Sequence, residues 1–194
     1  GTYASAESAP PAPGATAAAE PPGVIKPADL EHAIHDRLTA AVSAGMAVFF
    51  YADALLLPRS VINRKPSDYF CEDASGRLCP ARESVYAALQ EQVRRLFDRW
   101  PTAAGLVMRT GEVYPEATPH MVGSALHVSS CPACRAMTLQ DRLVRLITAL
   151  HEVVIRELDK VYVHRAWQPA IPGLPNMHDD PAVYREVASR SPQS

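Results

Sequence analysis

The chain has 194 residues, of which 47% are hydrophobic, and this is enough for one domain with a sizeable core. Its formal net charge is -2 at pH 7, and its lysines and arginines are dispersed rather than gathered in a basic stripe. Nucleic acid and anionic membrane surfaces are therefore not expected partners. No apolar run approaches the ~20 residues that span a bilayer, so a membrane-spanning protein is not expected either.

The first 23 residues consist almost entirely of Ala, Pro, Gly, Ser and Thr. Such a composition has too little large apolar surface to offset the entropy lost on ordering. We expect residues 1–23 to be a disordered linker and residues 24–194 to form one folded domain.

The first α-β unit begins at Pro27, a residue suited to the first position of a helix. Apolar residues at helical spacing follow, and Gly45 is a typical stop, so we predict a helix over residues 27–44. Residues 46–51 (Met-Ala-Val-Phe-Phe-Tyr) form a continuous apolar run. A run without alternation is typical of a strand that is covered on both faces.

Two further units repeat this order. Residues 85–100 place large apolar side chains at helical spacing, and Gly105-Leu-Val-Met108 is the strand after them. A third helix begins at Thr138, with Asp141 completing a capping box, and continues through Val154; its strand is residues 160–163. Asp180-Pro181 is a cap and first-turn pair that begins a fourth helix.

This alternation predicts an α/β protein with a parallel sheet, its strands in chain order and its helices on one side. We interpret it as part of a TIM (β/α) barrel. In a half barrel the inward strand faces lack their opposite wall. We therefore expect self-association, pairing with a complementary half, or an exposed apolar surface around Val48, Phe50, Val107 and Val163.

The loops that follow the strands are much longer than those that precede them. In parallel α/β folds the loops at the carboxyl ends of strands build the functional site. Carboxylates, arginines and aromatic rings gather there, the mixture that a sugar site needs. The alternative is that these residues only mark where strands emerge into water. The candidates are Tyr51, Asp53, Arg109, Glu112, Tyr114, His164, Arg165 and Trp167.

Two stretches carry a family resemblance. Ala104-Gly-Leu-Val-Met-Arg-Thr-Gly-Glu112-Val-Tyr and Lys160-Val-Tyr-Val-His-Arg-Ala-Trp167 resemble the barrel of the α-glucuronidase group of glycoside hydrolases and uncharacterised bacterial relatives. The resemblance covers roughly residues 44–168. It implies that Glu112 is the general acid and that Arg165 and Trp167 line a pocket for a carbohydrate, such as a uronic-acid-bearing glycan.

The chain also departs from this pattern. Hydrolysis of this kind needs a second carboxylate, which the family supplies from later strands of the barrel. We therefore expect a fragment of a hydrolase or a degenerate relative. The alternative from another class is a non-catalytic interaction module built on a half barrel, which self-associates or pairs with a complementary barrel half.

Four cysteines leave a competing interpretation open. Cys131-Pro-Ala-Cys134 has the spacing of half a zinc knuckle, and Cys71 and Cys79, or His120 and His127, would complete a tetrahedral site. Disulfides and free thiols are the other two states, and the redox compartment stays open. A zinc-stabilised α/β module is thus a third reading, and no other cofactor is expected.

Overall fold

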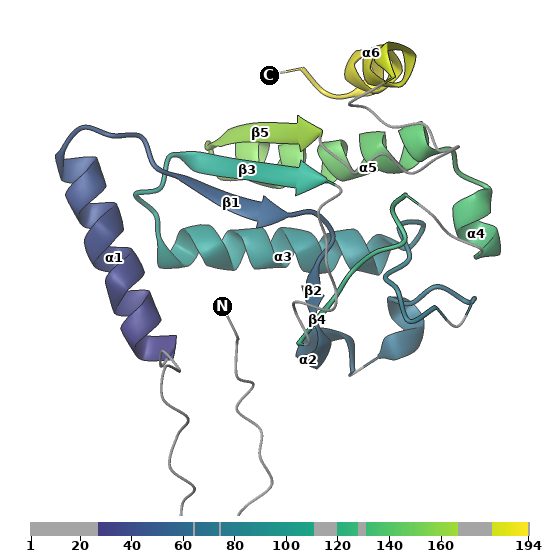
Figure 1. Cartoon of the computed structure of the whole chain (residues 1–194), viewed down its shortest axis with the longest axis horizontal. Helices are drawn as coiled ribbons and strands as arrows, with labels where there is room; N and C mark the ends of the chain where they lie inside the picture. The colour runs from purple at the N-terminus through teal and green to yellow at the C-terminus, as the bar shows by residue number, and fades with distance from the viewer. Residues whose placement is uncertain are drawn as a thin grey trace, which may run out of the picture.

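The computed structural model describes residues 27–63, 65–73, 75–110, 120–127, 131–166 and 180–193. The predicted linker lies outside these ranges. Three α-β units follow one another, and a last helix comes after them (Figure 1). The main elements are α1 (Pro27–Ser43), β1 (Phe49–Asp53), α3 (Glu83–Arg99), β3 (Gly105–Thr110), α5 (Leu139–His151), β5 (Val161–Ala166) and α6 (Pro181–Arg190).

The three strands form one parallel sheet in the order β1-β3-β5. The predicted order and direction of the strands are therefore confirmed, and the protein is of the mixed α/β kind. The register aligns three rows of residues across the sheet. From the amino to the carboxyl end these rows are Phe49, Gly105 and Val161; Tyr51, Val107 and Val163; and Asp53, Arg109 and Arg165.

Helices α3 and α5 cover one face of the sheet, because each has one apolar side. Leu89, Val93 and Phe97 of α3 are buried in the same core as Leu106 and Met108 of β3. Phe50 packs edge-on against Phe97, with their ring centroids 6.3 Å apart. The ring centroids of Phe50 and Trp100 are 5.4 Å apart. Leu143, Leu146 and Leu150 complete the core from α5.

The opposite face of the sheet, which we call the open face, is covered by no helix in the part of the chain that the structure describes. Phe49, Tyr51, Val161 and Val163 are exposed to 36%, 51%, 53% and 43%, respectively. An exposed apolar face was predicted, and Val163 belongs to it. The prediction was wrong for Val48 and Phe50, which pack against the helices. Successive side chains of a strand point to opposite faces of the sheet. An error of one residue in the assumed orientation of β1 therefore assigns each of its side chains to the wrong face.

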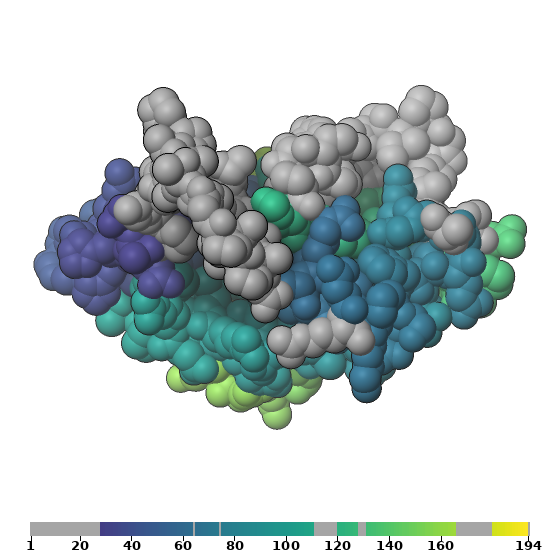
Figure 2. Space-filling view, turned by 90° about the horizontal axis from the view of Figure 1, so that it is seen from below, coloured from purple at the N-terminus to yellow at the C-terminus, as the bar shows by residue number. Residues whose placement is uncertain are grey.

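The long loops contain structure that the sequence did not predict. β2 (Leu57–Pro58) pairs antiparallel with β4 (Met121–Val122). Between β2 and α3 the chain also forms α2 (Arg59–Ile62) and the 3-10 helix η1 (Pro66–Asp68). An antiparallel bridge between Phe70 and Leu78 forms a hairpin, and the backbone N–H of Leu78 donates to the Gly123 carbonyl at 3.0 Å, which connects the hairpin to the segment after β4. Figure 2 shows this segment at one end of the molecule and α1 at the other, with α3 between them.

The predicted helix starts are confirmed by their caps. Thr138 and Asp141 form a reciprocal capping box at the start of α5, and the Asp180 carboxylate accepts from the first-turn N–H groups of α6. The predicted helix through Val154 is α-helical only to His151 and then continues as a π-helical segment, η3 (Glu152–Glu157). Asp159, with a positive φ of 52°, follows this segment. None of the described helices is long and apolar enough to cross a membrane.

Gly105 is the position where the sheet is least tolerant of a side chain. A Cβ there would lie 2.2 Å from the carbonyl oxygen of Val161 and 2.8 Å from the ring of Phe49. We expect Gly105→Ala to lower the free energy of unfolding by about 2–3 kcal/mol, because the β3–β5 backbone has to separate. Urea denaturation measures this change.

Gly45→Ala is the matched control. Nothing lies within 4 Å of its added Cβ, and only its φ of +78° opposes the change. The expected loss is about 1 kcal/mol. Equal losses at both positions would contradict the close approach of the strands at Gly105.

Candidate functional site

A row of charged residues lies at the edge of the open face, at the carboxyl ends of the three strands. Asp53, Arg109 and Arg165 are register partners on β1, β3 and β5. The Arg109 Nε–H donates to Asp53 Oδ1 at 2.5 Å, and both side chains are about three-quarters buried. A partly buried, charge-assisted hydrogen bond of this kind holds both groups in place. Three adjacent strands thus deliver ionised side chains to one place.

Tyr51 lies one row below and connects both arginines. Its ring centroid is 5.5 Å from the guanidinium carbon of Arg109 and 5.7 Å from that of Arg165. Arg165 also donates a hydrogen bond to the Tyr51 hydroxyl. Cation–π contact and hydrogen bonding therefore orient the two guanidinium groups over one aromatic ring. We call Tyr51, Asp53, Arg109 and Arg165 the strand-end cluster.

His164 belongs to the other side of the sheet. It pairs in register with the buried Met108, and its Nδ1 is 3.0 Å from the hydroxyl of Tyr162. Burial lowers the pKa of His164 to about 4, so the imidazole is neutral at pH 7. The structure therefore does not bring this predicted site residue to the strand-end cluster. Glu112, Tyr114 and Trp167 lie outside the described residues.

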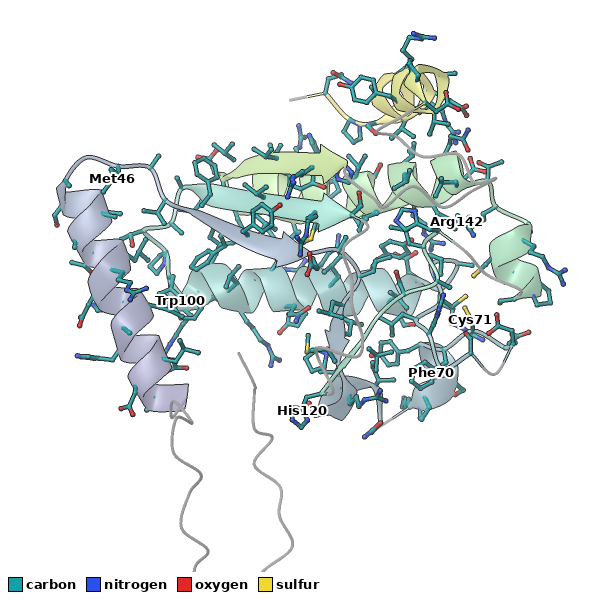
Figure 3. All side chains as sticks on the ribbon, viewed as in Figure 1. Met46, Phe70, Cys71, Trp100, His120 and Arg142 are labelled. Carbon is teal, nitrogen blue, oxygen red and sulfur yellow. The ribbon has the colours of Figure 1, made fainter. Side chains whose placement is uncertain are left out.

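The four cysteines form a second cluster near the same edge of the sheet. Cys71 and Cys79 flank the Phe70–Leu78 bridge of the hairpin, while Cys131 and Cys134 lie at α4 (Pro132–Arg135). All four sulfur atoms lie within 4.8 Å of one another, and all four residues are buried. Figure 3 shows Cys71 beside α4, away from His120. The metal-ligating group found among the described residues thus contains Cys71 and Cys79 rather than the two histidines.

The surroundings of Cys79 and Cys131 shift the pKa values of the two thiols in opposite directions. Burial raises the pKa of Cys79 to about 11, against a backbone hydrogen bond from Ala81. Burial also acts to raise the pKa of Cys131, but backbone hydrogen bonds from Cys134, Glu72 and Ala133 outweigh it and lower the pKa to about 7. Backbone N–H groups aimed at a sulfur favour its thiolate form.

Arg142 is a feature of this cluster that the sequence interpretation missed. It is only 7% exposed, and its guanidinium donates to the carbonyl oxygens of Cys134 and His127, each at 3.4 Å. It makes no ion pair with a carboxylate of the described residues. The signal was present in the sequence, because Arg142 interrupts the apolar side of the third predicted helix next to Leu143.

Comparison of the chain with protein-family models, curated proteins and solved structures gives no match.

Two partly buried histidines, His127 and His164, predict how stability depends on pH. Burial lowers the pKa of both His127 and His164 to about 4, against about 6.5 for an imidazole in the unfolded chain. Between these values the unfolded state binds more protons, so stability falls as pH falls from 6.5 toward 4. Each histidine is expected to remove up to about 2 kcal/mol between pH 7 and pH 5.

Denaturant unfolding at pH 7 and pH 5 tests this expectation. His164→Gln should reduce the pH-dependent loss by about half. His32→Gln should leave it unchanged, because His32 is exposed on α1. An imidazole of His164 that titrates near pH 6.5 by NMR would contradict the expectation.

Proposed function

We propose that this chain is part of a (β/α) barrel that binds carbohydrate at the carboxyl ends of its strands. The observation that carries the proposal is the strand-end cluster, in which three adjacent parallel strands bring a carboxylate, two guanidinium groups and a phenol together. Ligand sites of parallel α/β folds lie at this edge.

The open face supports the barrel reading. In a barrel this face would be the interior, which is filled by layers of side chains from the strands. The Phe49 and Tyr51 rows are two largely apolar layers, and the Asp53 row is a polar layer above them at the carboxyl end. This order of layers, apolar below and polar on top, is what a barrel with a ligand site at its top requires.

The chemistry of the cluster favours an acidic sugar. Planar guanidinium groups bind carboxylates through paired hydrogen bonds, and an aromatic face such as that of Tyr51 packs against a sugar ring. Asp53 accepts from Arg109 and can also accept from a sugar hydroxyl. A uronic acid offers all three partners.

Catalysis by this site rests on Glu112. It follows Thr110, the last residue of β3, by two positions and is proposed as the general acid that protonates the leaving oxygen. Asp53 is already engaged by Arg109, so hydrolysis would require a second carboxylate from further strands of the barrel. For this chain we therefore propose binding, with turnover dependent on those strands.

Titration of the full chain with methyl glucuronide, followed by NMR, tests binding. Arg165→Gln is expected to weaken it about tenfold or more, because a charge-assisted pair contributes about 1.5–3 kcal/mol. Glu112→Gln should bind as the wild type does, since an amide keeps the shape of the acid but cannot protonate the leaving oxygen. Arg37→Gln, an exposed arginine of α1, is the matched control and should have no effect.

Neutral methyl glucoside is the matched ligand control. Equal affinity for the glucoside and the glucuronide would contradict recognition of an acidic sugar by arginines. Absence of any binding at millimolar ligand would contradict the proposed function itself.

A second candidate function is a non-catalytic interaction module, and the exposed apolar face favours it. Parallel sheets are normally covered on both faces. The open rows present Phe49, Tyr51, Val161 and Val163 to solvent. The occupant that we propose for this role is a second copy of the chain, whose open face presents the same apolar rows.

Sedimentation velocity distinguishes this candidate. If the open face is an interface, the wild type sediments as a dimer, and Val163→Glu converts it to a monomer by burying an unpaired charge. Val61→Glu is the matched control, since Val61 is exposed to 40% on α2, away from the sheet. A wild-type monomer at high micromolar concentration would contradict the dimer.

A further inference from the structure

The four-cysteine cluster has the dimensions of a metal site. The Sγ atom of Cys134 lies 3.7 Å from that of Cys71 and 3.4 Å from that of Cys79. A zinc ion bonds to thiolate sulfur at about 2.3 Å, so the sulfurs of a tetrahedral site lie about 3.8 Å apart. The four sulfurs, all within 4.8 Å of one another, therefore surround a space that fits one such ion.

Apolar packing does not account for this cluster. Besides the four cysteines, Ala125 is its one buried member among the described residues, and Ala81 packs against it. Alanines contribute little apolar area, whereas ordering two long loops loses much conformational entropy. The large buried apolar side chains of the described residues belong to the other core, against the sheet. An interaction stronger than apolar contact is needed to hold the hairpin against α4.

The buried Arg142 is an independent indication of negative charge at this place. Its Nε atom is buried and has no hydrogen-bond partner in the described part of the structure. Burying a guanidinium without a counter-ion is unfavourable by several kcal/mol. Four thiolates around a divalent cation carry a net charge of -2, which would supply that counter-ion beside Arg142. The guanidinium contacts the carbonyl of Cys134, and Figure 3 shows Arg142 and Cys71 at the same end of the molecule.

We propose that Cys71, Cys79, Cys131 and Cys134 bind one zinc ion and that this ion holds two loops of the protein together. The hairpin belongs to the loop after β1, and α4 belongs to the loop after β3. All four coordination positions come from the protein, which is the arrangement of a structural rather than a catalytic zinc site. On binding, each thiol releases its proton and no electrons are transferred. The ion thus joins the loops that border the strand-end cluster.

The full chain, purified under reducing conditions without added metal, should contain one zinc ion per molecule by elemental analysis. Replacing zinc by Co²⁺ should give the visible absorption of a tetrahedral cobalt ion and a thiolate-to-cobalt charge-transfer band. Removing the metal with a chelator should lower the Tm by roughly 10 °C, because the binding energy of a structural zinc is folding energy.

Two variants at one position separate ligand loss from misfolding. Cys71→Ala should lose the metal, whereas Cys71→His should retain one ion, because imidazole is also a zinc ligand. Ser75→Ala, in the turn of the same hairpin, is the matched control and should keep the full zinc content.

Three results would overturn the proposal. One is reduced, folded protein that contains no metal while all four thiols react with a thiol reagent. Another is protein purified without reductant whose mass is lower than that of the fully reduced chain by four hydrogens, which indicates two disulfides. The third is iron in place of zinc at full occupancy. None of these results bears on glucuronide binding, which is measured separately.

Discussion

The parallel pairing of β3 with a strand on each side aligns side chains from distant parts of the sequence, and the strand-end cluster depends on it. Each row of the open face combines residues that are more than 50 positions apart in the chain. The collision of a Cβ at Gly105 with the carbonyl of Val161 shows how closely β3 and β5 approach. The backbone pairing of the strands fixes their register, and the register determines which side chains meet at the carboxyl ends.

The sheet is covered unequally, and this gives its two faces different roles. Helices α3 and α5 bury the face of Phe50, Leu106 and Met108, so that face supplies the stability of the core. The other face combines apolar rows with the strand-end cluster. A surface that is apolar over most of its area and charged at one edge is suited to the binding of a ligand or a partner.

The two clusters are linked through the long loops. The loop after β1 runs from the strand that carries Tyr51 and Asp53 to the hairpin that carries Cys71 and Cys79. The loop after β3 runs from Arg109 to Cys131 and Cys134. A zinc ion that joins these loops would limit their motion relative to the sheet edge, and binding groups on rigid elements keep their geometry at a smaller entropic loss.

Local patterns in the sequence were sufficient to predict the four main helices, the three strands of the parallel sheet and their order. Pro27, the Thr138 capping box and the Asp180 cap act within one helical turn, so they are readable without knowledge of the fold. The strand ends were also visible, as abrupt changes from apolar to charged residues. Asp53, Arg109 and Arg165 could therefore be expected to converge.

Only the tertiary structure decided which face of each strand is open and which cysteines meet. The continuous apolar run of β1 has no alternation, so nothing local distinguishes Phe50 from Phe49; pairing with β3 and contact with α3 decide it. Cys71 and Cys134 are 63 residues apart, and their sulfurs meet because the hairpin pairs with the segment after β4. Such contacts depend on the path of the whole chain, which short-range spacing does not encode.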